Sequence, residues 1–518
     1  WVFYTNRGQG IDSFGIHNKD NAIMEFSPAN TAYEDTALKG YRTFIKCNGE
    51  YFEPFFAREK DTKRNFYIHK NSIYLEEINQ KFGLKITVKY FVLPGESIGA
   101  LVRRLEIENL DGSEKSIEML DGLPKIIPYG IKNSEYKNMS NLLRSWSEIK
   151  NLENGIPYYT MRSSSDDSAE VRGIEGGYYC LSVHDEQILP VIYDPEAIFD
   201  YETALVNPIT FLEQGLDGVL KKEQCFYNKI PCGFTAAAFR LAGGADYRLD
   251  TFTGFAGSPA QINEKLPDLC KKDYLNFKER QAGEMADQLT KDVKTETAKP
   301  VFDQYIEQCY MDNFLRGGYP FIFGRDSNKS VVHLFSRKHG DPERDYNFFS
   351  IAGEYYSQGN GNFRDVSQNR RNDVFFHHEI GDFNIKTFFQ LIQADGYNPL
   401  EVRPSTFTVK PEFKASAEKL LQDNLKPHGE RPLTDKRKPR SEKLLTDGSK
   451  TYSEKPLTDS PEAYSEETMT DDSEACVEQL RKIISRPFTP GQAANCIARF
   501  HIKVDCGEEV FIEKLLSL

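Results

Sequence analysis

The apolar residues change their spacing near residue 275, and this change limits the folds open to the chain. The segment KITVKYFVLPGES starts at Lys85. Its apolar residues recur at every second position, as Ile86, Val88, Tyr90 and Val92, before a Pro-Gly stop. This spacing predicts a half-buried antiparallel strand. LEIENLDGSEKSIEML contains two more strand-like runs around a DGS turn, and GGYYCLSV and ILPVIYD continue the pattern. Residues 1–275 are therefore expected to form a large β-sandwich.

Beyond residue 275 the spacing becomes helical. Apolar residues in 301–318 fall at i, i+3, i+4, i+7, i+8 and i+12, and Gly317 and Gly318 close the segment. Residues 341–359 begin with Asp341 as an N-cap and Pro342 at the first helical position. A further helix is expected after the cap Asp382, with the apolar face Ile385, Phe388, Phe389 and Ile392. We expect a helical linker over 276–300 and a helical domain after it.

A twelve-residue repeat interrupts the helical part. ERPLTD, EKLLTD, EKPLTD and EETMTD place Asp435, Asp447, Asp459 and Asp471 at a constant spacing of twelve. Units this polar bury too little surface to offset the entropy lost on ordering. Residues 428–475 are therefore expected to be a disordered insertion, and a small ordered repeat array is the alternative.

Composition excludes several functions. No apolar run reaches the length of about 18 residues that a membrane span needs, and the net charge of -13 argues against binding nucleic acid. The nine cysteines form neither a CxxC pair nor a metal-binding cluster with histidine. His377 and His378 lack a third ligand, so no metal is expected. Free thiols are typical of a cytoplasmic protein. The chain starts at Trp1 and ends in a helical pattern, which is expected of an internal fragment of a longer protein.

The segment GNGNFRDVSQNRRND, residues 359–373, concentrates arginine, aspartate and amide side chains. We expect it to begin as a loop after a helix that Gly359 and Gly361 end. A carboxylate beside a guanidinium can bind the vicinal hydroxyls of a hexose. The alternative is a structural network in which the arginines of this segment pair with its aspartates. The segment 336–346 has the same ambiguity, since Arg337 and His339 would face a ligand or Asp341 would only cap a helix.

RDVSQN, residues 364–369, resembles the RDxxQD element of the inverting β-glucoside phosphorylases of glycoside hydrolase family 94. The whole stretch 336–373 resembles more closely the β-glucan phosphorylases of families 149 and 161. Residues 11–46, EMLDGLPKIIPYG and NKIPCGFTAA are also similar to the β-sandwich region of these enzymes. The resemblance implies an α+β multidomain protein: a β-supersandwich over 1–275, a helical linker over 276–300, and an incomplete (α/α)6 barrel over 301–427 and 476–518.

The resemblance also implies a set of substrate-binding residues. Arg364 and Asp365 would contact the glucosyl unit whose bond is broken, with Gln368 beside them. Asn369 stands where the family has aspartate, and Asp373 would replace that carboxylate if the loop bends back. Arg371 completes the expected set.

The activity implied is phosphorolysis of β-glucan oligosaccharides, with β-1,3 linkages favoured, to give α-glucose 1-phosphate with inversion. Inorganic phosphate is the co-substrate, no other cofactor is expected, and a homodimer is the family expectation. The catalytic acid of family 94 lies in a DWND-like segment that this chain lacks, so the acid is expected beyond residue 518. An inverting hydrolase of the same architecture and a non-catalytic carbohydrate-binding module are the alternatives.

Overall fold

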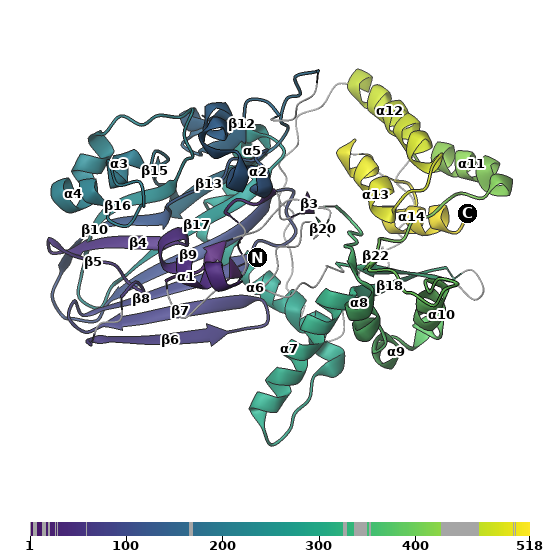
Figure 1. The fold of residues 1–518 in the computed structure, drawn as a ribbon, viewed down its shortest axis with the longest axis horizontal. Helices are drawn as coiled ribbons and strands as arrows, with labels where there is room; N and C mark the ends of the chain where they lie inside the picture. Colours follow the sequence, from purple (N-terminus) through teal and green to yellow (C-terminus); the bar gives the residue numbers. More distant parts are fainter. Residues whose placement is uncertain are drawn as a thin grey trace.

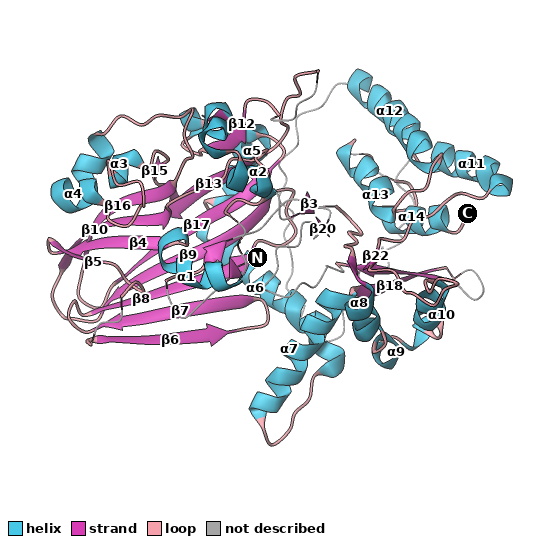
Figure 2. Ribbon diagram, viewed as in Figure 1, coloured by secondary structure: helices cyan, strands magenta, loops and turns pink. Residues whose placement is uncertain are grey.

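The computed structural model shows a β-rich N-terminal half and a mostly helical C-terminal half (Figures 1 and 2). It describes residues 2–3, 8–12, 17–18, 21–25, 27, 29–57, 60–164, 169–324, 329–335, 350–351, 354–425, 466–500, 502 and 504–518. The change from strands to helices follows the change of spacing in the sequence. Within the described residues, no helix is both long and apolar enough to cross a membrane.

The larger sheet of the N-terminal half has nine antiparallel strands. Its path is β11 (Ser147–Lys150), β12 (Tyr158–Met161), β13 (Gly177–His184), β17 (Asp246–Ala256), β9 (Gly99–Asn109), β8 (Leu84–Val92), β7 (Ser72–Asn79) and β6 (Thr62–Ile68), and β14 (Gln187–Ile188) pairs with β13. Strand β8 confirms the period-two prediction for Ile86, Val88 and Tyr90, which are buried. Val92 is exposed, because the strand ends there.

The smaller sheet has five strands and packs face to face on the larger one. Its order is β15 (Val191–Ile192), β16 (Gly233–Leu241), β10 (Lys115–Leu123), β4 (Arg42–Cys47) and β5 (Glu50–Phe52). Ile86 and Leu105 of the larger sheet share one hydrophobic core with Ile117 and Met119 of the smaller sheet. The predicted β-sandwich is thereby confirmed. The DGS turn lies between two strands, as predicted, and carries the chain from β9 in one sheet to β10 in the other.

Helices cover both outer faces of the sandwich. Helices α3 (Glu196–Phe199) and α4 (Ile209–Lys221) lie on the smaller sheet, where Phe199 and Phe211 pack against Phe44 and Phe234. Helices α5 (Pro259–Leu269) and α6 (Lys272–Thr290) begin on the larger sheet, where Leu275 joins its outer core. The same half also contains α1 (Ala29–Lys39), α2 (Asn133–Asn138), β1 (Val2–Phe3) and β2 (Ile11–Asp12). Helix α6 thus begins within the predicted sandwich range and continues through most of the predicted linker.

The C-terminal half begins with α7 (Pro300–Gly317), which confirms the helix predicted there. A hairpin of β18 (Tyr319–Phe323) and β19 (Ser330–Leu334) follows, although only helices were expected. Helices α11 (Lys414–Asn424), α12 (Glu466–Ile484), α13 (Pro490–Arg499) and α14 (Glu508–Leu516) share one core with this hairpin. The (α/α)6 barrel stays a prediction. Strand β20 (Ser350–Ile351) pairs with β3 (His17–Asn18), so a strand of the N-terminal half joins one of the C-terminal half.

Two predictions for this half need correction. Residues 359–373 do not form a loop after a helix: Gly361 lies in β21 (Gly361–Asn362), which pairs with β22 (Glu401–Val402), and α8 (Phe363–Arg370) starts directly after it. In the helix α10 (Phe383–Gln390), Phe388 is buried, but Ile385, Phe389 and the following Ile392 are exposed.

Two other sequence predictions fall partly or wholly outside the described residues. Helix α12 begins at Glu466, so regular structure extends into the range 428–475 that was predicted as an insertion. The earlier part of that range, residues 428–465, lies outside the described residues. So does the segment 336–346 with Arg337, His339 and the cap Asp341.

Candidate functional site

Helix α8 carries most of the residues that the sequence singled out, and its neighbours fix its position. Val366 is buried on its inner face, and Gly361 makes room for that side chain, since a Cβ there would lie 2.1 Å from Val366 Cγ2. At the other end, Gly317 of α7 approaches Asn369 so closely that an added Cβ would stand 3.0 Å from the Asn369 Cβ. Helix α8 therefore packs closely against the end of α7.

The first turn of α8 holds a carboxylate and a guanidinium side by side. Arg364 Nε donates to Asp365 Oδ1 over 3.2 Å, and Asn362 Nδ2 donates to Asp365 Oδ2 over 3.1 Å. The side chain of Arg364 is 83% exposed, whereas that of Asp365 is 17% exposed. The carboxylate is thus fixed in place while most of the guanidinium faces solvent. Such a pair can accept and donate hydrogen bonds to a bound polyol.

Three other predicted residues lie on or just beyond this helix. Asn369 Nδ2 donates to the backbone oxygen of Asp365 over 2.8 Å, so its amide supports the turn. Gln368 and Arg371 are exposed. Both can reach a ligand, and Gln368 lies one helical turn from Asp365 on α8, but among the described residues no hydrogen bond or ion pair joins either side chain to Asp365.

Asp373 lies apart from the pair, at the start of α9 (Asp373–Phe376). Its Oδ2 lies 2.9 Å from His333 Nε2 and accepts a hydrogen bond from Asn384 Nδ2, also over 2.9 Å. Its side chain is 12% exposed. The structure therefore places this carboxylate in a buried cluster with a strand of the hairpin and with α10, not beside Asp365.

Arg370 completes the buried cluster. Its Nε donates to the backbone oxygen of Gly317 over 2.6 Å, and Asn384 Nδ2 donates to its backbone oxygen over 3.0 Å. The sequence predicted for Arg370 only a structural role, as one of the arginines of the 359–373 segment, and these contacts agree with that role. Sequence reasoning missed His333 and Asn384, because nothing in the runs SVVHL and DFNIK marks them. Only the tertiary fold brings these residues together.

Burial dominates the electrostatics of this cluster. It raises the pKa of the Asp373 carboxyl to about 7, although the hydrogen bond from Asn384 and the positive charge of Arg370 act in the opposite direction. Burial also lowers the pKa of His333 well below its ordinary value, and the charges of Arg370 and His377 lower it further. For Arg370, burial lowers the pKa to about 10, against the attraction of Asp373. Near neutral pH, the contact between Asp373 and His333 is therefore a hydrogen bond to a neutral imidazole.

The two groups differ in what they can do chemically. The Arg364–Asp365 pair is accessible and charged, and it suits the recognition of a neutral polar ligand. The cluster around Asp373 is enclosed and suits the positioning of α8 against α7. No group of three histidine, cysteine or acidic side chains among the described residues has the geometry of a metal site.

No protein-family model and no curated protein matches the chain. Among solved structures, a bacterial glucoamylase complexed with acarbose aligns over 78% of this chain and 50% of its own, with 12% identity and a TM-score of 0.40. A putative kojibiose phosphorylase from the human microbiome aligns over 55% and 29%, with 9% identity and a TM-score of 0.16. The chain thus spans half the length of the glucoamylase.

Proposed function

We propose that the protein is a carbohydrate-active enzyme that cleaves β-glucosidic bonds of β-glucan oligosaccharides with phosphate and releases α-glucose 1-phosphate with inversion. The observation that carries the proposal is the Arg364–Asp365 pair on the first turn of α8, in the RDVSQN segment that resembles the sugar-binding element of such phosphorylases. The preference for β-1,3 linkages rests on the closer resemblance of residues 336–373 alone.

The contacts of the pair suit a role in holding a sugar. Asn362 and Arg364 each occupy one lone pair of the Asp365 carboxylate, which leaves further lone pairs for two sugar hydroxyls. The exposed Arg364 has N–H groups on the same side of the turn to donate to a neighbouring hydroxyl. Adjacent hydroxyls of a glucosyl unit need this combination of acceptor and donor.

The chemistry of phosphorolysis explains why the Arg364–Asp365 pair need not act as a catalytic acid or base. An inverting hydrolase uses one carboxylic acid for the leaving oxygen and one carboxylate to activate water. Phosphate is already an anionic nucleophile, so a single acid suffices. In this proposal Arg364 and Asp365 bind the substrate without transferring a proton.

The test is the substitution Asp365→Asn in the complete protein, with Asp382→Asn as the matched control. Asp382 forms an exposed ion pair with Lys386 at the start of the neighbouring helix α10. Hydrogen bonds to charged groups contribute about 1.5–3 kcal/mol, so Asp365→Asn is expected to lower kcat/KM by roughly ten- to a hundredfold. The melting temperature should stay near that of the wild type. Unaltered kinetics in a folded Asp365→Asn protein would remove the site assignment.

The same assay separates the two alternatives. Sugar release at the same rate with and without phosphate would indicate an inverting hydrolase. Binding of oligosaccharide with no product in either condition would indicate a binding module without catalysis.

A further inference from the structure

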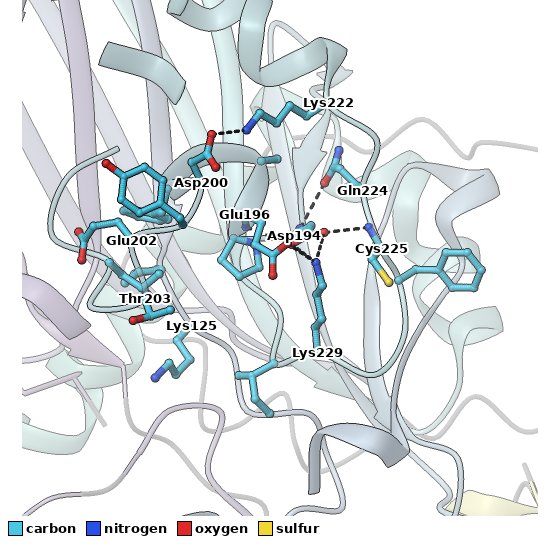
Figure 3. A pocket seen from close by; sticks show the side chains of 18 of the residues that line it. Lys125, Asp194, Glu196, Asp200, Glu202, Thr203, Lys222, Gln224, Cys225 and Lys229 are labelled. Atoms are coloured by element: carbon cyan, nitrogen blue, oxygen red, sulfur yellow. Dashed lines mark hydrogen bonds and ion pairs between the residues drawn. The ribbon is translucent and has the colours of Figure 1, made fainter. Parts of the chain in front are cut away.

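A cavity of about 700 Å³ opens on the β-sandwich (Figure 3), on the side of α3 and far from α8 (Figure 1). Its walls come from α3 with the segment that follows it and from the segment 222–230. The first segment belongs to the cover of the smaller sheet, and the second leads into strand β16. The cavity therefore shares no residue with the site on helix α8.

Charges of the two signs nearly balance in the cavity, and several of them form ion pairs. Four basic and five acidic side chains line it. Lys222 Nζ lies 2.8 Å from Asp200 Oδ2, and Lys229 Nζ lies 3.0 Å from Asp194 Oδ2 and 2.8 Å from Glu196 Oε2. Figure 3 shows these residues turned toward one another along the wall. A wall that is polar but nearly neutral disfavours a strongly charged ligand, such as a phosphate ester or a polyamine.

The rim formed by residues 200–207 is fixed before any ligand arrives. The Glu202 carboxylate accepts hydrogen bonds from the backbone N–H groups of Ala204 and Asn207, over 3.0 and 2.8 Å. The buried Arg42 donates from the smaller sheet to the backbone oxygens of Leu205 and Val206. Leu205 has a φ of 57°, a left-handed conformation that costs energy in a residue other than glycine. The rest of the loop holds this strained residue, so the rim is preorganised.

Three aromatic side chains line this cavity and remain exposed. Tyr201 on the rim is 79% exposed, and Phe226 and Tyr227 on the opposite segment are also exposed. An aromatic face carries partial negative charge, which complements the C–H groups on the face of a pyranose ring. The hydroxyls at the edge of that ring match the carboxylates, ammonium groups and amide of the polar wall. A site that combines flat apolar surfaces with a polar, nearly neutral wall suits the binding of a sugar.

We propose that this cavity is a second carbohydrate-binding site, which takes a neutral oligosaccharide and performs no chemistry on it. The proposal does not rest on the function assigned to α8, because the two sites share no residue. Tyr201 supplies a stacking surface, and the fixed rim presents it without a rearrangement of the loop.

The first experiment measures binding of laminarihexaose and of cellohexaose to the complete protein by calorimetry. It uses an Asp365→Asn background, which weakens binding at α8. Tyr201→Ala is expected to raise the Kd of the remaining site by roughly tenfold, because it removes one aromatic contact with the sugar. The control is Tyr305→Ala, which removes another exposed ring, on α7, and should leave the Kd unchanged.

The second experiment needs no substitution in the cavity. Cys225 lines it, and Cys309 is an exposed thiol on α7. Alkylation by iodoacetamide, followed at each cysteine by peptide mass spectrometry, should slow at Cys225 but not at Cys309 when either hexasaccharide is added. Equal protection of both thiols, no protection at Cys225, or a Kd that Tyr201→Ala does not change would overturn the proposal. If the complete protein shows no phosphorolysis while a hexasaccharide still protects Cys225, only the function assigned to α8 is contradicted.

Discussion

Replacing Asp373 by asparagine should change how the stability of the protein depends on pH. The folded structure raises the pKa of this carboxyl to about 7, mainly through burial. In the unfolded chain the carboxyl returns to its ordinary value near 4. Between these two values the folded state binds a proton that the unfolded state has released. The contribution of Asp373 to stability is therefore fully present at low pH and is lost as pH rises through about 7.

The size of the stability change follows from the difference between the folded and unfolded pKa values of Asp373. Each pH unit between the two pKa values changes the free energy of unfolding by about 1.4 kcal/mol. From pH 5 to pH 8 the wild type should thus lose roughly 2.5 kcal/mol relative to Asp373→Asn, whose amide does not titrate. Below its ordinary pKa, His333 destabilises both proteins, because burial keeps the imidazole neutral only in the folded state. That contribution lowers stability as pH falls, so it acts in the direction opposite to the effect of Asp373.

The assay is urea unfolding of both proteins at several pH values from 5 to 8. Asp382→Asn serves as the control, since that carboxylate is exposed on α10. The difference between wild type and Asp373→Asn should shift steadily in favour of the variant as pH rises. Parallel stability curves would show that Asp373 has an ordinary pKa and that the cluster with His333 and Arg370 is hydrated.

Three further predictions concern the fold. Arg103→Met should lower the free energy of unfolding by about 3–5 kcal/mol in urea, because it removes the ion-pair partner of the fully buried Asp121 and leaves that charge with the hydrogen bond from Thr43. Lys221→Met, in an exposed pair, should change stability by less than about 1 kcal/mol. Gly122→Ala should lower the melting temperature by several degrees, since the added Cβ would stand 1.9 Å from the Gly233 oxygen on the neighbouring strand β16. Gly112→Ala is the control and should leave the melting temperature unchanged, because its Cβ would have no atom within 4 Å. Deleting residues 428–465 from the complete protein should leave the melting temperature within a few degrees of the wild type, because the cost of closing a polar surface loop changes only logarithmically with its length; a larger fall would show that the segment packs on the protein.

The sandwich was predictable from the sequence because local spacing decides which side chains a strand buries. Ile86 and Val88 alternate with polar residues in the chain, and they are buried in β8. The sheet to which each strand belongs is decided by packing between distant strands. For this reason the DGS turn between two strands was predictable, but the passage from β9 in one sheet to β10 in the other was not.

The site was predictable only in part. The adjacent residues Arg364 and Asp365 pair as their composition suggested, because a contact between neighbours depends little on the fold. Polar composition and two nearby glycines suggested a loop, but packing of Val366 and the approach of α7 stabilise a helix there. The burial of Asp373 depends on His333 and Asn384, which lie far from it in the sequence. No local pattern reveals such a contact.

The most direct test of the proposed function is the phosphate dependence of sugar release. The complete protein is incubated with laminarihexaose, with and without inorganic phosphate, and both glucose 1-phosphate and free glucose are measured. We predict that α-glucose 1-phosphate forms only when phosphate is present and that the oligosaccharide shortens by one unit for each molecule formed. Free glucose released at the same rate without phosphate would contradict the phosphorylase assignment.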